Sequence, residues 1–305
     1  MNIITEIREA FASLKMNRAI RIETLPYEYP AWVFRKADRF GVAVKQPSEL
    51  IIAERFSNAR LRTDSIEIDG RSERVITLTS NVDGLRNEFA VVCAQFVDPG
   101  IRGEQRKILD EQPYTWWRNW SSLLGNSIRL KQPTDVLGEL ITLKYLVKSG
   151  MKPSWIGHKG HSHDIEYYGG TIEVKSTVSR YGYMVKINSQ FQMMVEKGDL
   201  QLSFVRFEPT INGVSINSTV EELIYLGYPQ EELESALESL GYEYGMGVRS
   251  DCFSVIDAKL YPINDDFPKI NRNSFADGKI PEGVVKIEYT VDLDNLMNSD
   301  FLDAI

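Results

Sequence analysis

The residues best suited to chemistry lie in one short run, HDIEYYGGTIEVKST. The pair Gly169–Gly170 predicts a two-residue hairpin turn, because both central positions of a type I′ turn need positive φ. Such a turn places Glu166 opposite Glu173 and Asp164 opposite Lys175. Side chains alternate along a strand, so we expect the three acids and the lysine on one face of the hairpin.

This face concentrates negative charge. Carboxylates that lie opposite one another on a sheet are destabilising, and a bound divalent cation relieves the repulsion. Oxygen ligands at this density suit Mg²⁺, with Mn²⁺ able to substitute. The alternative interpretation is a solvated hairpin face with incidental charges.

The elements around the hairpin must hold it in place. Apolar side chains on its other face are expected to pack against a helix. Thr134 or Asp135 is the predicted N-cap of that helix, which runs through GELITLKYLVKSG and ends at Gly150. The helix carries one acid, Glu139, in apolar surroundings. A strand is expected over 182–188 and another over 200–207.

An acid followed after a short gap by Glu-X-Lys resembles the PD-(D/E)xK nuclease superfamily. Here the acid is Asp164 and the Glu-X-Lys is Glu173-Val174-Lys175, while His163 stands where the motif has proline. The core likeness covers residues 134–207, and most of the chain resembles a bacterial family described only by this motif. The resemblance implies a restriction-endonuclease-like fold of the α+β or α/β class, with a mixed central sheet flanked by helices.

The resemblance also implies a function: a Mg²⁺-dependent DNA endonuclease of a bacterial restriction or phage-defence system. Asp164 and Glu173 would hold the ion, and Lys175 would orient or deprotonate the attacking water. Glu139 would be a further ligand, or a helix acid paired with Lys175 or Arg129. Glu166, nearer the turn, is expected outside the ligand set.

Other residues near the motif are candidate substrate contacts. The three histidines of the chain fall within HKGHSHD and suggest either a transition-metal site or the lining of the site's entrance. We favour the entrance, because no fourth ligand and no cysteine is near. The residues predicted to bind substrate are His163, Ser176, Thr177, Arg180 and Gln190.

The rest of the chain predicts two domains. Residues 1–112 read as a strand-rich α+β domain of unknown role, with a helix from Ile3 and strand-like runs that include Glu88 to Phe96. Residues 113–305 form the nuclease-like domain with an acidic C-terminal extension. Residues 221–240 predict one or two acidic helices broken at Gly227 and Pro229.

Composition limits the class of protein. The 305 residues are 43% hydrophobic and 26% charged, which is typical of a globular protein. The net charge is -8, yet residues 101–200 carry 14 Lys and Arg against 10 Asp and Glu. Cys93 and Cys252 are too few for a disulfide framework. Without a long apolar run or a signal pattern, we expect a cytoplasmic protein with no membrane contact.

Partners follow from the chemistry expected. DNA is the expected substrate, and cleavage of a duplex needs two active sites, so we expect a homodimer. An ATPase or methyltransferase partner is compatible with the sequence. Two other functions stay open: a catalytically inactive nuclease fold that serves as a DNA-binding or assembly subunit, and an interaction protein whose acidic C-terminal face meets a basic partner.

Overall fold

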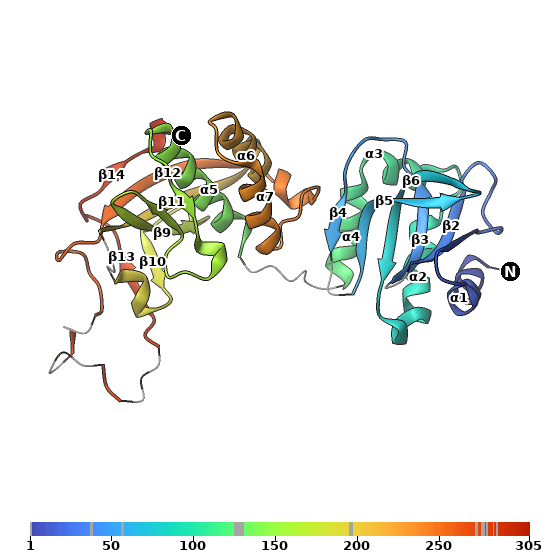
Figure 1. Cartoon of the computed structure of the whole chain (residues 1–305), viewed down its shortest axis with the longest axis horizontal. Coiled ribbons are helices and arrows are strands. Elements are labelled where there is room, and N and C mark those ends of the chain that lie inside the picture. The colour runs from blue at the N-terminus through green and yellow to red at the C-terminus, as the bar shows by residue number, and fades with distance from the viewer. Residues whose placement is uncertain are drawn as a thin grey trace. The chain divides into compact units, whose positions relative to one another are not determined.

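A computed structural model shows that the chain forms two compact units (Figure 1). The first comprises Met1–Ile128 with Glu243–Gly247, and the second Arg129–Tyr242 with Val248–Ile305. The structure describes residues 2–36, 39–55, 58–124, 131–194, 198–271, 274–275, 278, 280–282, 284 and 286–305, and only the backbone of 120–124 and 190–191.

The first unit is a six-stranded antiparallel sheet with helices packed on it. The strand order is β1-β2-β3-β6-β5-β4. Strand β6 of the β5–β6 hairpin therefore pairs with β3, and β4 lies at the edge of the sheet. The elements are α1 (Ile3–Ser13), β1 (Arg18–Arg21), β2 (Ala31–Lys36), β3 (Arg39–Lys45), β4 (Ala53–Arg55), β5 (Arg60–Ile68), β6 (Arg71–Ser80), α2 (Arg86–Val97), α3 (Glu104–Glu111) and α4 (Pro113–Leu124).

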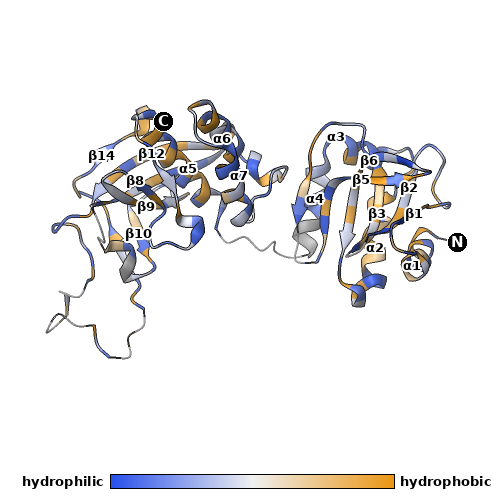
Figure 2. Ribbon diagram, viewed as in Figure 1, coloured by the Kyte–Doolittle hydropathy of each residue, from blue (hydrophilic) through white to orange (hydrophobic). Residues whose placement is uncertain are grey.

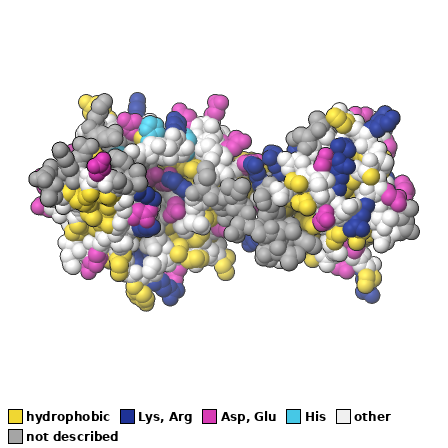
Figure 3. Space-filling view, turned by 90° about the horizontal axis from the view of Figure 1, so that it is seen from below, with side chains coloured by type: hydrophobic (Ala, Val, Ile, Leu, Met, Phe, Trp, Pro, Cys, Tyr) yellow, Lys and Arg dark blue, Asp and Glu magenta, His cyan; other side chains and the backbone are white. Residues whose placement is uncertain are grey.

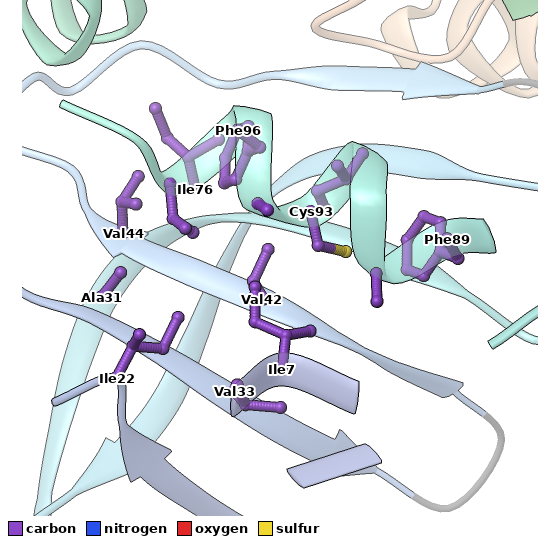
Figure 4. Packing of buried hydrophobic residues seen from close by; sticks show 14 of the residues in the cluster. Ile7, Ile22, Ala31, Val33, Val42, Val44, Ile76, Phe89, Cys93 and Phe96 are labelled. Atoms are coloured by element: carbon purple, nitrogen blue, oxygen red, sulfur yellow. The ribbon is translucent and has the colours of Figure 1, made fainter. Parts of the chain in front are cut away.

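One predicted strand of this unit is wrong. Glu88 to Phe96 lies within helix α2, not in a strand. The run is rich in valine and aromatic residues, which favours a strand locally. However, Phe89, Cys93 and Phe96 recur at helical spacing and are all buried against strand residues such as Val42 (Figure 4). Burial of one helix face on the sheet overrides the local preference.

The first unit is longer than the expected domain of residues 1–112. Helix α4 belongs to it, because Trp116 packs edge-to-face on Phe96 of α2 with ring centroids 5.0 Å apart. The segment Glu243–Gly247 also belongs to it, and the Tyr114 hydroxyl donates a hydrogen bond to the Gly245 carbonyl at 2.6 Å. The chain therefore leaves the second unit briefly and returns to it, which no local sequence signal indicates.

The second unit is built on a mixed sheet in the order β14-β12-β11-β9-β8-β7. Strands β9 and β11 are parallel and their other neighbours are antiparallel. The elements are α5 (Pro133–Lys148), β7 (Ser154–Trp155), β8 (Ile165–Tyr167), β9 (Gly170–Thr177), β10 (Met184–Ile187), β11 (Asp199–Val214), α6 (Ile216–Tyr225), α7 (Gln230–Ser239), β12 (Phe253–Pro262), β13 (Tyr289–Asp292) and β14 (Ser299–Asp300).

Each face of this sheet is covered. Helices α5, α6 and α7 pack on one face through a core that includes Leu140, Ile172 and Phe207. The β10–β13 pair covers the other through a core that includes Leu202 and Val291. Figure 2 shows hydrophobic and hydrophilic residues mixed along the strands of this sheet. Its strand β11 is buried almost continuously from Leu200 to Phe207, as a strand covered on both faces requires. The mixed α and β class expected from the sequence is confirmed.

The C-terminal third is part of the fold core, which corrects the expected extension. Strand β12 pairs along β11, and β14 pairs with β12, so both complete the central sheet. The predicted acidic helical segment forms α6 and α7, with Gly227 and Pro229 between them. Acidic residues of this third therefore include members of the fold's own elements, such as Glu222 on α6 and Asp257 on β12.

Helix α5 begins two or three residues earlier than predicted. Its N-cap is Gln132, and Asp135 takes the third position of a capping box instead of the cap itself. Pro133 at the first helical position is pre-organised for this start. Within the described residues, no helix combines the length and apolar character needed to cross a membrane.

Candidate active site

The hairpin β8–β9 places the predicted acids, with a corrected register. Glu166 pairs with Thr171, not with Glu173, because the two turn residues are Tyr168 and Gly169. Only Gly169 of the glycine pair has a positive φ, of 107°. Gly170 lies in the strand, where an added Cβ would overlap the Asp199 carbonyl.

The corrected register keeps the predicted face. Partners move by two residues, and side chains repeat with period two, so no side chain changes face. Position 164 now lies opposite Glu173 instead of Lys175. Asp164, Glu173 and Lys175 therefore come together, whereas Glu166 is exposed nearer the turn and does not line their cavity.

Asp164 is fixed by the backbone around it. Its Oδ2 accepts a hydrogen bond from the Val174 amide at 2.9 Å, and its Oδ1 accepts one from the Lys131 ammonium at 2.9 Å. Gly157 packs closely against the same carboxylate, and a side chain there would overlap Oδ1. Asp164 is buried, so a single orientation of its carboxylate is held from three sides.

Glu173 and Lys175 form an ion pair at the centre of the site. The Lys175 ammonium lies 2.8 Å from Glu173 Oε1, and the Gln192 amide donates to the same oxygen at 2.6 Å. The backbone N–H of Asn188 in turn donates a hydrogen bond to Gln192 Oε1 at 2.8 Å, which sets the orientation of the Gln192 side chain. In the described part of the chain, Glu173 Oε2 accepts no hydrogen bond and is available to a ligand.

Glu139 reaches the site from α5 and is 2% exposed. Its Oε2 accepts a hydrogen bond from the Trp155 indole at 2.7 Å. Its Oε1 is paired with Lys131, whose ammonium therefore bridges Glu139 and Asp164. Of the two expectations for Glu139, the geometry matches pairing with a cation, but the cation is Lys131 and not Lys175, which pairs with Glu173. The other expected partner, Arg129, lies outside the described residues.

Burial makes this cluster of acids hard to ionise. Desolvation and the nearby Asp164 charge raise the pKa of Glu173 to about 8, and the same two causes raise the pKa of Glu139 to about 8. The pKa of Lys131 is raised because Glu139 and Asp164 outweigh its own burial. The site therefore disfavours additional negative charge and attracts a cation.

A cavity of about 630 Å³ opens beside these groups. Figure 3 shows acidic and basic side chains side by side in the second unit, on the same face as the histidines. The lining residues include Lys131, Asp135, Glu139, His161, Asp164, Glu173, Lys175, Ser176, Thr177, Lys186, Asn188 and Gln192.

Two carboxylates of the site could bind a divalent metal ion. Asp164 Oδ1 and Glu173 Oε2 are hard oxygen donors beside a cavity, as Mg²⁺ requires when it keeps several waters. Among the residues that the structure describes, no group of three or more His, Cys, Asp and Glu side chains is placed to hold an ion. These residues fit an ion held by two carboxylates and solvent, and Lys131 occupies the place beside Glu139.

The predicted substrate contacts divide into two groups. Ser176 and Thr177 line the cavity. Arg180 and His163 do not: Arg180 is exposed and paired with Glu208, and His163 is buried beside a second cavity near the turn. The side chain of Gln190 lies outside the described residues.

The remaining histidines differ in their surroundings. His161 lines the cavity, as expected for the entrance. His158 instead packs edge-to-face on Trp155, with ring centroids 5.6 Å apart. His161 and His163 both line the second cavity, and His158 lines neither cavity.

Two residues of the candidate site, Gln192 and Lys131, are not among those predicted from the sequence. Gln192 lies two residues from the predicted Gln190, so the segment was identified but not the residue. Lys131 lies eight residues before Glu139 and outside any motif. Its proximity to Asp164 depends on how the start of α5 meets β8, which no local pattern reveals.

Comparison with known proteins identifies the family. Neither curated proteins nor solved structures give a match to the chain. A family model described as "Putative PD-(D/E)XK family member, (DUF4420)" matches residues 21–294, which includes both units. The chain therefore belongs to this PD-(D/E)XK family.

Proposed function

We propose that this protein is a Mg²⁺-dependent endonuclease that hydrolyses phosphodiester bonds of DNA in a bacterial restriction or phage-defence system. The observation that carries the proposal is the meeting of Asp164, Glu173 and Lys175 on one hairpin face beside a cavity. Family membership agrees with a nuclease-like protein. The role in restriction or defence rests on the family resemblance alone.

The proposed ion ligands are Asp164 Oδ1 and Glu173 Oε2. A divalent ion bound there supplies Lewis-acid polarisation of the scissile phosphate and neutralises charge on it. The Val174 amide and the Gln192 side chain hold the two carboxylates in place. The two carboxylates are thus preorganised before any substrate binds.

Lys175 is the proposed catalytic base or electrostatic clamp. Its ammonium lies beside Glu173 and 3.4 Å from Gln192 Oε1, so its position is fixed by two partners. From there it can orient the attacking water, accept its proton, or offset charge on the phosphate oxygens. General-base and electrostatic contributions of this kind are worth on the order of 10²–10⁴ in rate.

The cavity offers groups that suit a phosphodiester backbone. Ser176, Thr177 and the Asn188 amide side chain are neutral hydrogen-bonding groups at its wall, and Lys186 adds a positive charge. Contacts of this type position a nucleic-acid strand without reading its sequence. A second active site is needed to cut both strands, so we propose a homodimer, which light scattering after size exclusion tests.

The test is nicking of supercoiled plasmid by the full chain with Mg²⁺, Mn²⁺ or EDTA. We expect cleavage with either ion, none with EDTA, and at least a 10²-fold loss in Lys175→Met. Lys152→Met, an exposed lysine of the same unit, is the matched control and should cleave normally. Plasmid that is bound but never cut would favour the inactive DNA-binding subunit instead.

A further inference from the structure

Lys131 occupies a position that ordinarily suits a metal ion. Its ammonium is paired with Glu139 Oε1 and lies 2.9 Å from Asp164 Oδ1, so one positive charge bridges two buried carboxylates. The Lys131 side chain is 27% exposed, which leaves it in contact with the cavity while its head is shared by the acids.

The fold holds this lysine in place. The Tyr242 hydroxyl donates a hydrogen bond to the Lys131 carbonyl at 2.7 Å, and the next residue, Gln132, is the N-cap of α5. Tyr242 is itself fully buried. The lysine backbone is therefore anchored at its own carbonyl and at the residue that follows it.

In the described part of the chain, Lys131 is the cation paired with Glu139 Oε1. Its Oε2 is bound to the Trp155 indole, and the carboxylate is almost fully buried. A buried carboxylate beside a second one is strongly disfavoured unless a cation compensates it. An ion that contacted both Glu139 and Asp164 would have to displace this ammonium from two partners at once.

We propose that Lys131 is a specificity-determining residue for metal binding: its ammonium takes the cation position between Glu139 and Asp164, and its removal creates a divalent-ion site there. The inference rests on the proposed function for the ion at Asp164 and Glu173. It extends that function by limiting the site to one divalent ion, because the Lys131 ammonium occupies the place that a second ion would take.

The test counts Mn²⁺ ions bound by the full chain, with isothermal titration calorimetry and the electron paramagnetic resonance signal of free Mn²⁺. We expect one ion in the wild type and two in Lys131→Met, which keeps the length of the side chain and removes its charge. Lys131→Arg keeps the charge and should bind one. Lys131→Met combined with Glu139→Gln should lose the added ion, which locates it.

The outcomes separate this inference from the proposed function. No ion in the wild type and one in Lys131→Met would support the role of Lys131 while contradicting the metal-dependent enzyme. Equal numbers of ions in the wild type and Lys131→Met would overturn the inference. Circular dichroism checks that each variant is folded, and Lys131→Met with Glu139→Gln removes the acid that Lys131→Met alone leaves without its cation.

Discussion

Replacing Glu173 by Gln should change how the stability of the protein depends on pH. Glu173 is 3% exposed, and its pKa is raised from 4.5 to about 8 by burial and the Asp164 charge. Between these two pH values the folded state binds more protons than the unfolded state. Stability therefore falls as pH rises through this window, and the loss is complete above pH 8.

The magnitude follows from the size of the shift. Between pH 5.5 and the folded pKa of about 8 lie about 2.5 pH units. At 1.36 kcal/mol per unit, the wild type therefore loses roughly 3 kcal/mol of unfolding free energy between pH 5.5 and pH 8.5. Glutamine carries no proton to lose. Relative to wild type, Glu173→Gln should therefore gain roughly 3 kcal/mol of unfolding free energy when the pH rises from 5.5 to 8.5. For a unit of this size that corresponds to about 6–12 °C in Tm.

The assay is differential scanning calorimetry of wild type and Glu173→Gln at pH 5.5 and pH 8.5, in EDTA and in Mn²⁺. In Mn²⁺ the wild type should regain stability at pH 8.5, because an ion that binds only the folded state stabilises it. Glu166→Gln, an exposed acid on the same hairpin, is the control and should follow the wild type. Parallel pH profiles of wild type and Glu173→Gln would refute the reasoning.

Three further substitutions test the parts around the acids. Gln192→Leu removes the donor to Glu173 Oε1 and should lower plasmid cleavage about 10-fold with an unchanged circular dichroism spectrum; unchanged cleavage would contradict its positioning role. Gly138→Ala places a Cβ onto Ser176 Oγ and should cost about 1–2 kcal/mol in urea unfolding, whereas a stabilised variant would show that α5 can move away from β9. Trp155→Phe leaves Glu139 Oε2 without its donor and should cost about 1–3 kcal/mol, most above pH 8 where Glu139 is ionised; a cost independent of pH would count against this pairing.

The sequence allowed the active face to be predicted but not its register. Side chains alternate with period two, so a pairing shifted by two residues still puts Asp164, Glu173 and Lys175 on one face. The predicted face is therefore correct although the predicted turn residues are wrong. In the structure the turn is formed by Tyr168 and Gly169, and Gly170 is already in the strand, where it pairs with Asp199 of β11. That contact lies nearly thirty residues downstream and is invisible in the hairpin sequence.

Other errors have the same origin in contacts that are distant along the chain. The segment of α2 reads as a strand until its buried face on the first sheet is known. Lys131 enters the site only because α5 starts next to Asp164. The end of helix α5 was predicted, since Gly150 with its positive φ is a local stop signal, whereas its N-cap lies two or three residues before the predicted one.

The measurement that tests the central claim most directly is the anomalous scattering of crystals soaked in Mn²⁺. The account predicts one anomalous peak beside the hairpin, about 2.1 Å from a carboxylate oxygen of Asp164 and of Glu173, with the Lys175 ammonium adjacent. A fully soaked crystal with no peak at these two carboxylates, or with the ion held elsewhere, would contradict it.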